Sequence, residues 1–492
     1  MNQFFSRTIR PSSSVQSLSS LIARHARPLF DYDSILSCIG DQTRVVLIGE
    51  ASHGTQEFYE MRSEITKRLI EQKGYTIVAI EADWPDAYRV NSYVRSHLRS
   101  IGEDETAEQS LRSFQRFPTW MWRNHTMVSF VEWLRRHNAK IASPGRETGI
   151  YGLDLYSLNA SRQEVLNYLE SVGDEQLLES ARRNYACFNR FDNDDGVYGY
   201  KTGFGLSASC QQQVLQVLRH MLERHAQAMS RGESVWEQDA YFYAKHNAIL
   251  VADAEEYYRN MYVRSANTWN IRDSHMYRTL DALMTDISDQ SGESKSQRKA
   301  VVWAHNSHIG DASHTESSDR GEFNIGQLAR EKLGAENTFH IGFTTFNGSV
   351  TAANNWDEDP HHMKVRDGLD GSYEQLFHES LQLLRKEKND PHLNGFLMNF
   401  KGNHMSDDNS NLVIPSVLND QLQERRLERM IGVLYKPKTE RASHYIYCNL
   451  PKQFDCVIHV DRTRALKPLE AHPRWIEAEK KDLIPETYPS GL

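Results

Sequence analysis

Short runs of apolar, mostly β-branched residues alternate along the chain with longer segments of helical periodicity. Residues 45–50 (VVLIGE) are typical of a buried strand. Apolar residues then recur at helical spacing from Phe58 to Leu69, and Gly74 follows as a residue that ends helices. Residues 76–82 (TIVAIEA) predict a second strand. A strand, helix and strand in this order form a right-handed unit, so the two strands are expected to run parallel.

Similar apolar runs predict more buried strands. They are residues 149–154, 300–305, 338–346, 430–435, 445–449 and 455–460. Between Ser157 and Asp286 such runs are scarce and helix-forming residues dominate. We therefore expect an α/β fold with a mainly parallel central sheet flanked by helices, which a helical lid or insertion subdomain interrupts.

These patterns divide the chain into four parts. They are an N-terminal tail and helix (1–34), a discontinuous α/β core (35–156 plus 298–470), a helical insertion (157–297) and a C-terminal tail (471–492). Leu18 and Ile22 are expected on the buried face of the first helix. Residues 351–372 are polar throughout and predict a long functional or mobile loop.

Polar side chains stand at the C-terminal ends of several predicted strands, where open parallel sheets bind their ligands. These side chains are Glu50 and His53, Glu81, Asp154, and His305 with Asn306 and His308. Because parallel strands bring these ends to one edge of the sheet, we expect the side chains to share a cleft. Trp84, just after the second strand, is the best candidate for its apolar wall.

Histidine beside a carboxylate is typical of general-base catalysis, and His53 with Glu50 or Glu81 fits this pattern. Arg62 follows in the next helix, where its guanidinium can hold a carboxylate or an oxyanion. A covalent nucleophile is less well supported, because the chain has no GxSxG elbow. Ser52 is adjacent to His53 and would point away from it. A water molecule activated by His53 is the simpler prediction.

Each of these residues also has a purely structural interpretation. Glu50 can hold loop amides, His53 can be a hydrogen-bonded turn residue, and Glu81 can pair with a buried arginine. Asp154 is better explained as structural than as catalytic. Two histidines and several carboxylates can also bind a divalent metal, although the chain has no HExxH motif. The predicted site therefore needs no cofactor, with a divalent metal as the alternative.

Composition narrows the class of protein. The 492 residues carry a formal net charge of −9 and a pI near 6.2, which excludes an electrostatic nucleic-acid surface. No apolar run is long enough to span a membrane. Five scattered cysteines without a CxxC pair favour a reducing compartment and argue against a disulfide framework. We expect a cytoplasmic protein, with a mitochondrial one as the alternative because the first 30 residues hold four arginines and no acid. The oligomeric state is left open.

Several long motifs in one order resemble the erythromycin esterase family, from about Ala26 to Leu469. They include VVLIGEASHGTQEFYEMR, AIEADWPDAYRVNSYVR, YGLDLYSL, TWNIRDSHM, VVWAHNSHIGDA and IGFTTFNGSVTAA. The resemblance implies an α/β core with a helical lid and a hydrolase of macrolide lactones, or a relative of unsettled substrate. It assigns the general base to His53. The family's other motif positions fall on Glu50, Arg62, Glu81, His305 and His308.

The sequence thus predicts a hydrolase of a small-molecule carboxylic ester or lactone that uses His-activated water without a covalent intermediate. The catalytic set is His53, Glu50, Glu81 and His305, and the residues expected to bind substrate are Arg62, His308, Asn306 and Trp84. The alternative is a metal-binding or small-molecule-binding protein, or a metallohydrolase, on the same scaffold.

Overall fold

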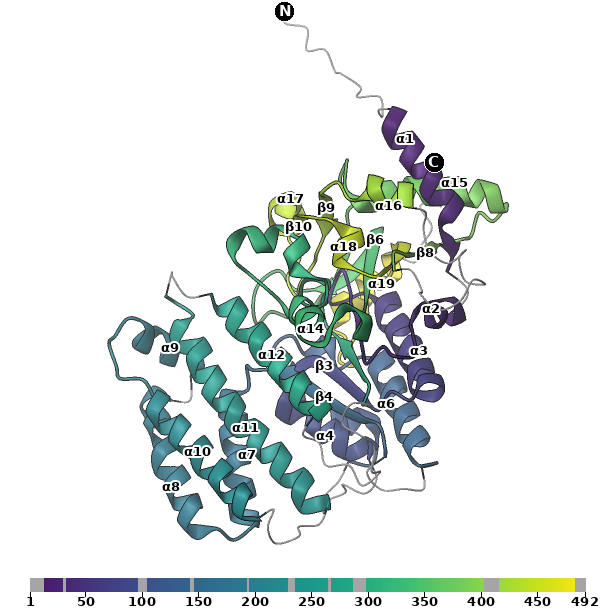
Figure 1. The fold of residues 1–492 in the computed structure, drawn as a ribbon. Coiled ribbons are helices and arrows are strands. Elements are labelled where there is room, and N and C mark those ends of the chain that lie inside the picture. Colours follow the sequence, from purple (N-terminus) through teal and green to yellow (C-terminus); the bar gives the residue numbers. More distant parts are fainter. Residues whose placement is uncertain are drawn as a thin grey trace, which may run out of the picture.

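A twisted sheet with helices on both faces forms the centre of the molecule in the computed structural model (Figure 1). The structure describes residues 13–29, 32–95, 104–141, 146–192, 194–228, 235–263, 267–285, 298–401 and 416–482. The nine strands of the main sheet follow the order β1-β8-β11-β6-β2-β5-β3-β4, with β7 paired to β6. All neighbouring pairs from β11 to β4 are parallel, whereas β1–β8, β8–β11 and β6–β7 are antiparallel.

The strands have the following bounds. They are β1 Arg27–Pro28, β2 Val45–Ile48, β3 Ile77–Asp83, β4 Gly149–Asp154, β5 Ala300–Trp303, β6 Thr338–Ala352, β7 His361–Val365, β8 Gly395–Asn399 and β11 Cys456–Thr463. A separate two-stranded sheet contains β9 Arg426–Arg429 and β10 Tyr445–Cys448. The predicted α/β fold with a mainly parallel sheet is therefore confirmed.

Helices cover both faces of the sheet. One face carries α2 Tyr32–Cys38, α3 Gln56–Lys73, α4 Trp84–Val94, α5 Ala107–Ser110 and α6 His125–Asn138. The other carries α1 Ser13–His25, α14 Ile325–Leu333, α15 Tyr373–Lys388 and α16 Ser416–Leu422. Short helices α13 Asn306–Ile309, α17 Glu440–Ser443 and α18 Leu450–Gln453 lie in the C-terminal half.

The region between β4 and β5 is helical, as predicted. It contains α7 Leu158–Ser171, α8 Glu175–Tyr185, α9 Asp195–Gly203, α10 Gln211–Ala228, α11 Val235–Asn260 and α12 Thr268–Thr285. In Figure 1 these helices stand together beside β3 and β4. The sequence also indicates a polar linker at residues 288–299, most of which lies outside the described residues, and the proposed domain boundaries stay a prediction.

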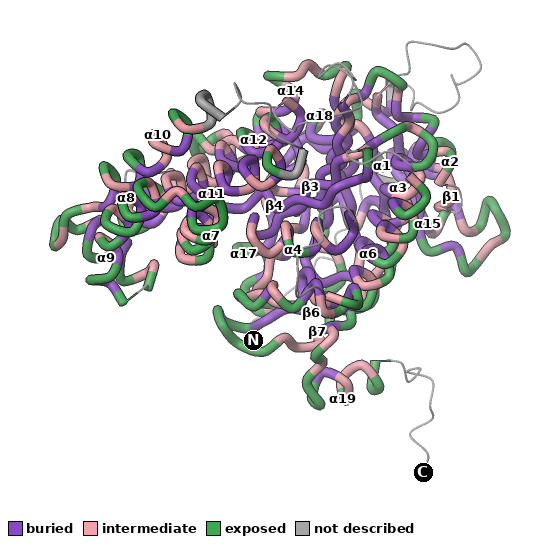
Figure 2. Tube along the Cα trace, turned by 90° about the horizontal axis from the view of Figure 1, so that it is seen from below, coloured by how far each residue is buried: buried purple, intermediate pink, exposed green. Residues whose placement is uncertain are grey.

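Alternation along the strands separates two apolar cores. Val45 and Leu47 of β2 pack into one cluster of buried side chains, and Val46 and Ile48 pack into the other. The first cluster continues without a break into α7, α10, α11 and α12. In Figure 2 the stretches of the chain coloured as buried continue from β3 and β4 into these helices. The helical region is thus anchored to the same face of the sheet as α1 and α15.

Several local predictions are confirmed. Gly74 ends α3 in the left-handed conformation at φ 71°. Leu18 and Ile22 of α1 are buried. In the described residues, no helix combines the length and apolar character that a membrane span needs.

Other local predictions are wrong. Residues 430–435 make only isolated bridges, because the strand of that region is β9 and ends at Arg429. Four strands were not predicted, β1, β7, β8 and β9. The predicted loop 351–372 is instead part of a β-hairpin, since β6 continues to Ala352 and pairs with β7. The predicted C-terminal tail contains α19 Pro473–Asp482, which docks through the buried Trp475.

One disulfide joins Cys187 to Cys210 in the helical region, with a Cα–Cα separation of 5.9 Å. The sequence argued against such a bond, because the two cysteines lie 23 residues apart without a recognisable spacing. Cys38, Cys448 and Cys456 are free and buried.

Candidate active site

The ends of β2, β3, β4 and β5 open into one cavity of about 1050 Å³. His53, Glu81, His305 and His308 all line it, and Asp154 does as well. The convergence follows from the parallel register of β2, β5, β3 and β4, which places their carboxyl ends side by side. The predicted shared cleft therefore has a physical counterpart.

Glu50 lies directly beneath His53 and is fully buried. One carboxylate oxygen contacts His53 Nδ1 at 2.9 Å, and the other accepts a hydrogen bond from Arg62 Nη2 at 3.0 Å. A carboxylate at Nδ1 favours the tautomer that carries its proton there, so Nε2 keeps the basic lone pair. Tyr59 fixes the same turn, because its hydroxyl donates to the His53 carbonyl at 3.0 Å.

Glu81 stands at the centre of a second, more heavily bonded cluster. Its Oε1 accepts from Arg272 Nη2 at 2.7 Å, and its Oε2 accepts from the backbone N–H of His305 at 2.8 Å. Arg272 also donates from Nε and Nη2 to Asp154, at 2.9 and 2.7 Å. Burial alone would raise the pKa of Glu81, but the surrounding charges of His308, His53 and Arg272 hold it below its usual range.

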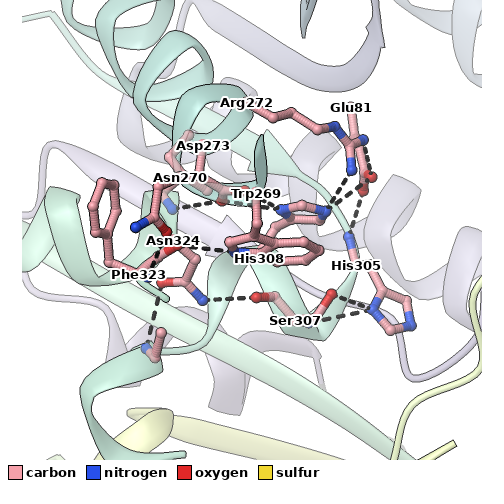
Figure 3. Close-up of polar contacts among 12 residues, drawn as sticks. Glu81, Trp269, Asn270, Arg272, Asp273, His305, Ser307, His308, Phe323 and Asn324 are labelled. Carbon is pink, nitrogen blue, oxygen red and sulfur yellow. Dashed lines mark hydrogen bonds and ion pairs between the residues drawn. The ribbon is translucent and has the colours of Figure 1, made fainter. Parts of the chain in front are cut away.

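His308 is held on three sides, as Figure 3 shows. Its Nδ1 lies 3.0 Å from both oxygens of the buried Asp273, and its Nε2 lies 3.0 Å from Arg272 Nη1. Its ring stacks on Trp269 with centroids 4.4 Å apart and planes 6° apart. Burial alone would lower the pKa of His308, but the Asp273 and Glu81 carboxylates raise it. Neither ring nitrogen is left without a partner.

His305 differs, because only one of its nitrogens is bonded. Its Nδ1 lies 2.9 Å from Ser307 Oγ and accepts the Ser307 backbone N–H at 3.3 Å. Among the described residues its buried Nε2 has no hydrogen-bond partner. Burial first, and then the neighbouring His53, lower the pKa of His305 well below its usual value. The ring is therefore neutral at pH 7 and carries its proton on Nε2, 4.8 Å from the His53 ring between centroids.

The wall of the cavity away from these groups is largely aromatic. Its apolar side chains come from four regions of the chain and include Phe114, Phe117, Trp122, Tyr257, Tyr258, Met261, Trp356, Val433 and Leu434. Charged pairs interrupt this wall, since Arg116 Nε donates to Asp83 Oδ2 at 2.7 Å and Arg320 Nη2 donates to Glu322 Oε2 at 2.8 Å. Burial and the nearby Asp83 raise the pKa of Asp86, also on the wall, to about 7. The cavity thus combines a polar catalytic edge with a weakly polar interior.

Three predicted substrate-binding residues lie away from the cavity lining. Arg62 is fully buried behind Glu50, so it cannot contact an oxyanion while it holds that carboxylate. Asn306 turns toward β6, where its amide donates to the Phe343 carbonyl at 2.7 Å. Trp84 packs between β4 and α11 and donates from Nε1 to the Tyr243 carbonyl at 3.3 Å. These positions differ from the sequence expectation because strand-end spacing does not fix side-chain direction.

Three residues of α12 were not predicted to belong to the site. They are Trp269, Arg272 and Asp273, which bind His308 and the two carboxylates of β3 and β4. The segment TWNIRDSHM that contains them was noted only as a family motif. An Arg-Asp pair beside a Trp at helical spacing was the available signal, but nothing in the sequence connects it with Glu81.

Within the described part of the chain, no group of three or more His, Cys, Asp and Glu side chains is arranged to hold a metal ion. Both ring nitrogens of His308 are already directed at protein groups, Arg272 and Asp273. The arrangement instead offers one basic imidazole nitrogen, at His53, and one neutral imidazole donor, at His305.

Comparisons with known proteins place the chain in a family. The family model described as erythromycin esterase matches residues 70–463. A putative hydrolase of Bacillus subtilis, YbfO, is 22% identical over 358 residues, which cover 70% of this chain and 76% of that protein. The erythromycin esterase type II of Escherichia coli is 29% identical over 108 residues, which cover 22% and 23% of the two chains.

Solved structures share the fold. A succinoglycan biosynthesis protein has a TM-score of 0.69 at 18% identity and covers 93% of this chain and 100% of its own. A Bacillus cereus protein gives the same TM-score at 17% identity, with 92% and 99% covered. A mutant of the erythromycin esterase EreC, in its open conformation, has a TM-score of 0.58 at 14% identity, with 89% and 95% covered.

Proposed function

Because this chain belongs to the erythromycin esterase family, we propose that it hydrolyses carboxylic esters, lactones included, with a water molecule activated by His53. The observation that carries the proposal is the pairing of His53 with Glu50 at the cavity edge. The 2.9 Å contact to Nδ1 orients the ring and leaves Nε2 as the basic nitrogen. A cationic ring formed during catalysis is stabilised by the same carboxylate.

The reaction proceeds in two steps. His53 Nε2 removes a proton from water while the water oxygen bonds to the ester carbonyl carbon. The carbonyl oxygen becomes an oxyanion, and the neutral His305 ring, which lines the same cavity with its centroid 4.8 Å from that of His53, is the group proposed to stabilise it. When the intermediate collapses, the C–O bond to the alcohol breaks and His53 returns its proton to the leaving oxygen. The products are a carboxylic acid and an alcohol.

The remaining polar residues position this pair. Arg62 holds Glu50 from behind, and Glu81 fixes the backbone of His305. Arg272 donates hydrogen bonds to both Glu81 and Asp154 and also contacts His308, so it connects all three. Ser52 is a poor nucleophile candidate, because it is buried and its hydroxyl is bonded to Thr55. A covalent acyl-enzyme is therefore not part of the proposed reaction.

Hydrolysis of a panel of macrolides, simple lactones and aryl esters tests the proposal. With any ester that is turned over, His53→Ala should lower kcat/KM by at least about 10²-fold, since general-base catalysis contributes about 10²–10⁴-fold. His125→Ala, an exposed histidine on α6, is the control and should change nothing. Ser52→Ala should keep activity near wild type. Full activity in His53→Ala would contradict the proposal, and loss in Ser52→Ala alone would favour a covalent route.

A further inference from the structure

An exposed tryptophan stands at the rim of the cavity. Trp356 is 66% exposed and lines the cavity from the turn between β6 and β7. Its ring lies edge-on to Phe117, with centroids 5.3 Å apart. Phe117 in turn packs edge-on against the buried Trp120, also at 5.3 Å. A continuous aromatic path therefore runs from the core to the mouth of the cavity and ends in solvent.

The fold positions this indole through a structured turn. Asn355 Nδ2 donates to Glu358 Oε1 at 2.6 Å across the turn. The Ala353 N–H donates to the Val433 carbonyl at 3.0 Å, and the Tyr435 N–H donates to the Ala353 carbonyl at 3.1 Å. These bonds connect the hairpin to the segment that supplies Val433 to the cavity wall. Contacts within the protein thus hold the turn that carries Trp356 at the rim of the cavity.

The exposure of Trp356 has an energetic consequence. A tryptophan is one of the largest apolar side chains, and covering it with an apolar surface is strongly favourable. Here the indole is neither covered by the protein nor remote from its cavity. At about 1050 Å³, the cavity is also at the upper end of the range of small-molecule sites, which is roughly 300–1,000 Å³. A short-chain ester at His53 would leave most of the space and the rim unfilled.

We propose that Trp356 and Phe117 form a rim subsite that binds the apolar, ring-bearing body of the substrate remote from its ester group. This inference rests on the proposed esterase function and narrows its substrate class. The substrates are esters with a bulky, weakly polar body, and short-chain esters lack the part that the subsite recognises. Binding energy gained at the rim positions the ester at the catalytic edge, where His53 and His305 act.

Two p-nitrophenyl esters with the same leaving group test the subsite, the acetate and the 4-cyclohexylbutyrate. Trp356→Ala should raise KM for the bulky ester about tenfold, because an aromatic contact is lost, and change the acetate less than twofold. Trp356→Phe should restore most of the affinity. Phe204→Ala removes an aromatic side chain of similar exposure (57%) that does not line the cavity, and should leave both esters unaffected.

A binding measurement separates this inference from the proposed function. The p-nitroanilide of 4-cyclohexylbutyric acid, an amide analogue, is titrated calorimetrically into His53→Ala protein with and without Trp356→Ala. If wild type hydrolyses neither of these esters nor any member of the panel, the proposed function fails, and the expected tenfold loss of amide affinity still supports the subsite. Unchanged affinity, no binding to either protein, or an equal loss for both esters in Trp356→Ala would overturn the rim subsite.

Discussion

Two buried carboxylates serve the same edge of the sheet in different ways. Glu50 is held by His53 and Arg62, and Arg62 uses only Nη2 for this contact. Glu81 is held by Arg272, which uses all three of its nitrogens on Glu81, Asp154 and His308. Among the described residues the first cluster leaves His53 Nε2 without a hydrogen-bond partner, whereas in the second every nitrogen of Arg272 and His308 is bonded.

This difference separates a residue that can take part in the reaction, His53, from residues that hold their neighbours in place. A group that must exchange protons needs an unoccupied nitrogen at the cavity surface, and His53 meets that condition. A saturated cluster cannot exchange protons without breaking several charge-assisted hydrogen bonds, so it is better suited to hold neighbouring groups in place. The two histidines of the family motif, His305 and His308, fall on opposite sides of this division. His305 keeps a free donor, and His308 does not.

The largest expected contrast is in stability. Arg272→Met would remove the guanidinium that the buried Glu81 and Asp154 share, which should lower the free energy of unfolding by about 3–5 kcal/mol. Arg62→Met would affect only Glu50, which keeps its contact with His53, and should cost less. Urea unfolding of both variants measures the difference. A larger decrease in the free energy of unfolding in Arg62→Met than in Arg272→Met would contradict the proposed difference between the two clusters.

The pH dependence of stability provides a second contrast. The pKa of Glu81 is lower in the folded protein than its value of 4.5 in the unfolded chain. Ionised Glu81 therefore contributes to the free energy of unfolding above pH 4.5, and this contribution is lost as the pH falls further. Glu428 behaves in the opposite way. It is fully buried, its neighbours Asn306 and Cys448 are neutral donors, and burial raises its pKa to about 8. The folded state therefore keeps a proton that the unfolded chain releases, and stability falls as the pH rises from about 4.5 to about 8.

Two variants isolate these contributions. Between pH 4.5 and 8 the titration of Glu428 should lower the free energy of unfolding by on the order of 4 kcal/mol, and Glu428→Gln should remove this decrease. Glu81→Gln should flatten the acid side of the stability curve below pH 4.5. Thermal or urea unfolding across pH 3–9 gives both curves. An unchanged neutral-pH slope in Glu428→Gln would show that this carboxyl is ionised in the folded protein.

The smallest expected effect concerns the stacking of Trp269 on His308. Trp269→Leu removes an aromatic contact worth about 0.5–1.5 kcal/mol, so kcat/KM should fall roughly two- to tenfold. Trp133→Leu is the matched control, because Trp133 also stacks on a histidine, His137, away from the cavity. An equal decrease of kcat/KM in both variants would show that the decrease comes from lower stability in general and not from the positioning of His308.

Sequence reasoning succeeded where a cluster is local. Glu50, His53 and Arg62 lie within one strand–turn–helix unit, so the predicted strand and helix bring them near one another, although Arg62 lies behind Glu50 and not at the cavity. Arg272 lies 191 residues from Glu81, and only the packing of α12 against β4 brings them into contact. The same limit applies to the strand expected at 430–435. Its residues are apolar, but β10 pairs with 426–429 and so decides where the strand ends.

The order of strands in the sheet has a consequence for how the chain assembles as it is synthesised. β2, which carries Glu50 and His53 at its end, pairs only with β5 and β6, and neither begins before Ala300. At about 5–20 residues per second, roughly a quarter of a minute to a minute passes between translation of β2 and of its first neighbour. β3 can pair with β4 well before that. The segment that holds the proposed base therefore waits as an unpaired strand, and the ribosome-bound chain completes its catalytic edge only in the last third of synthesis.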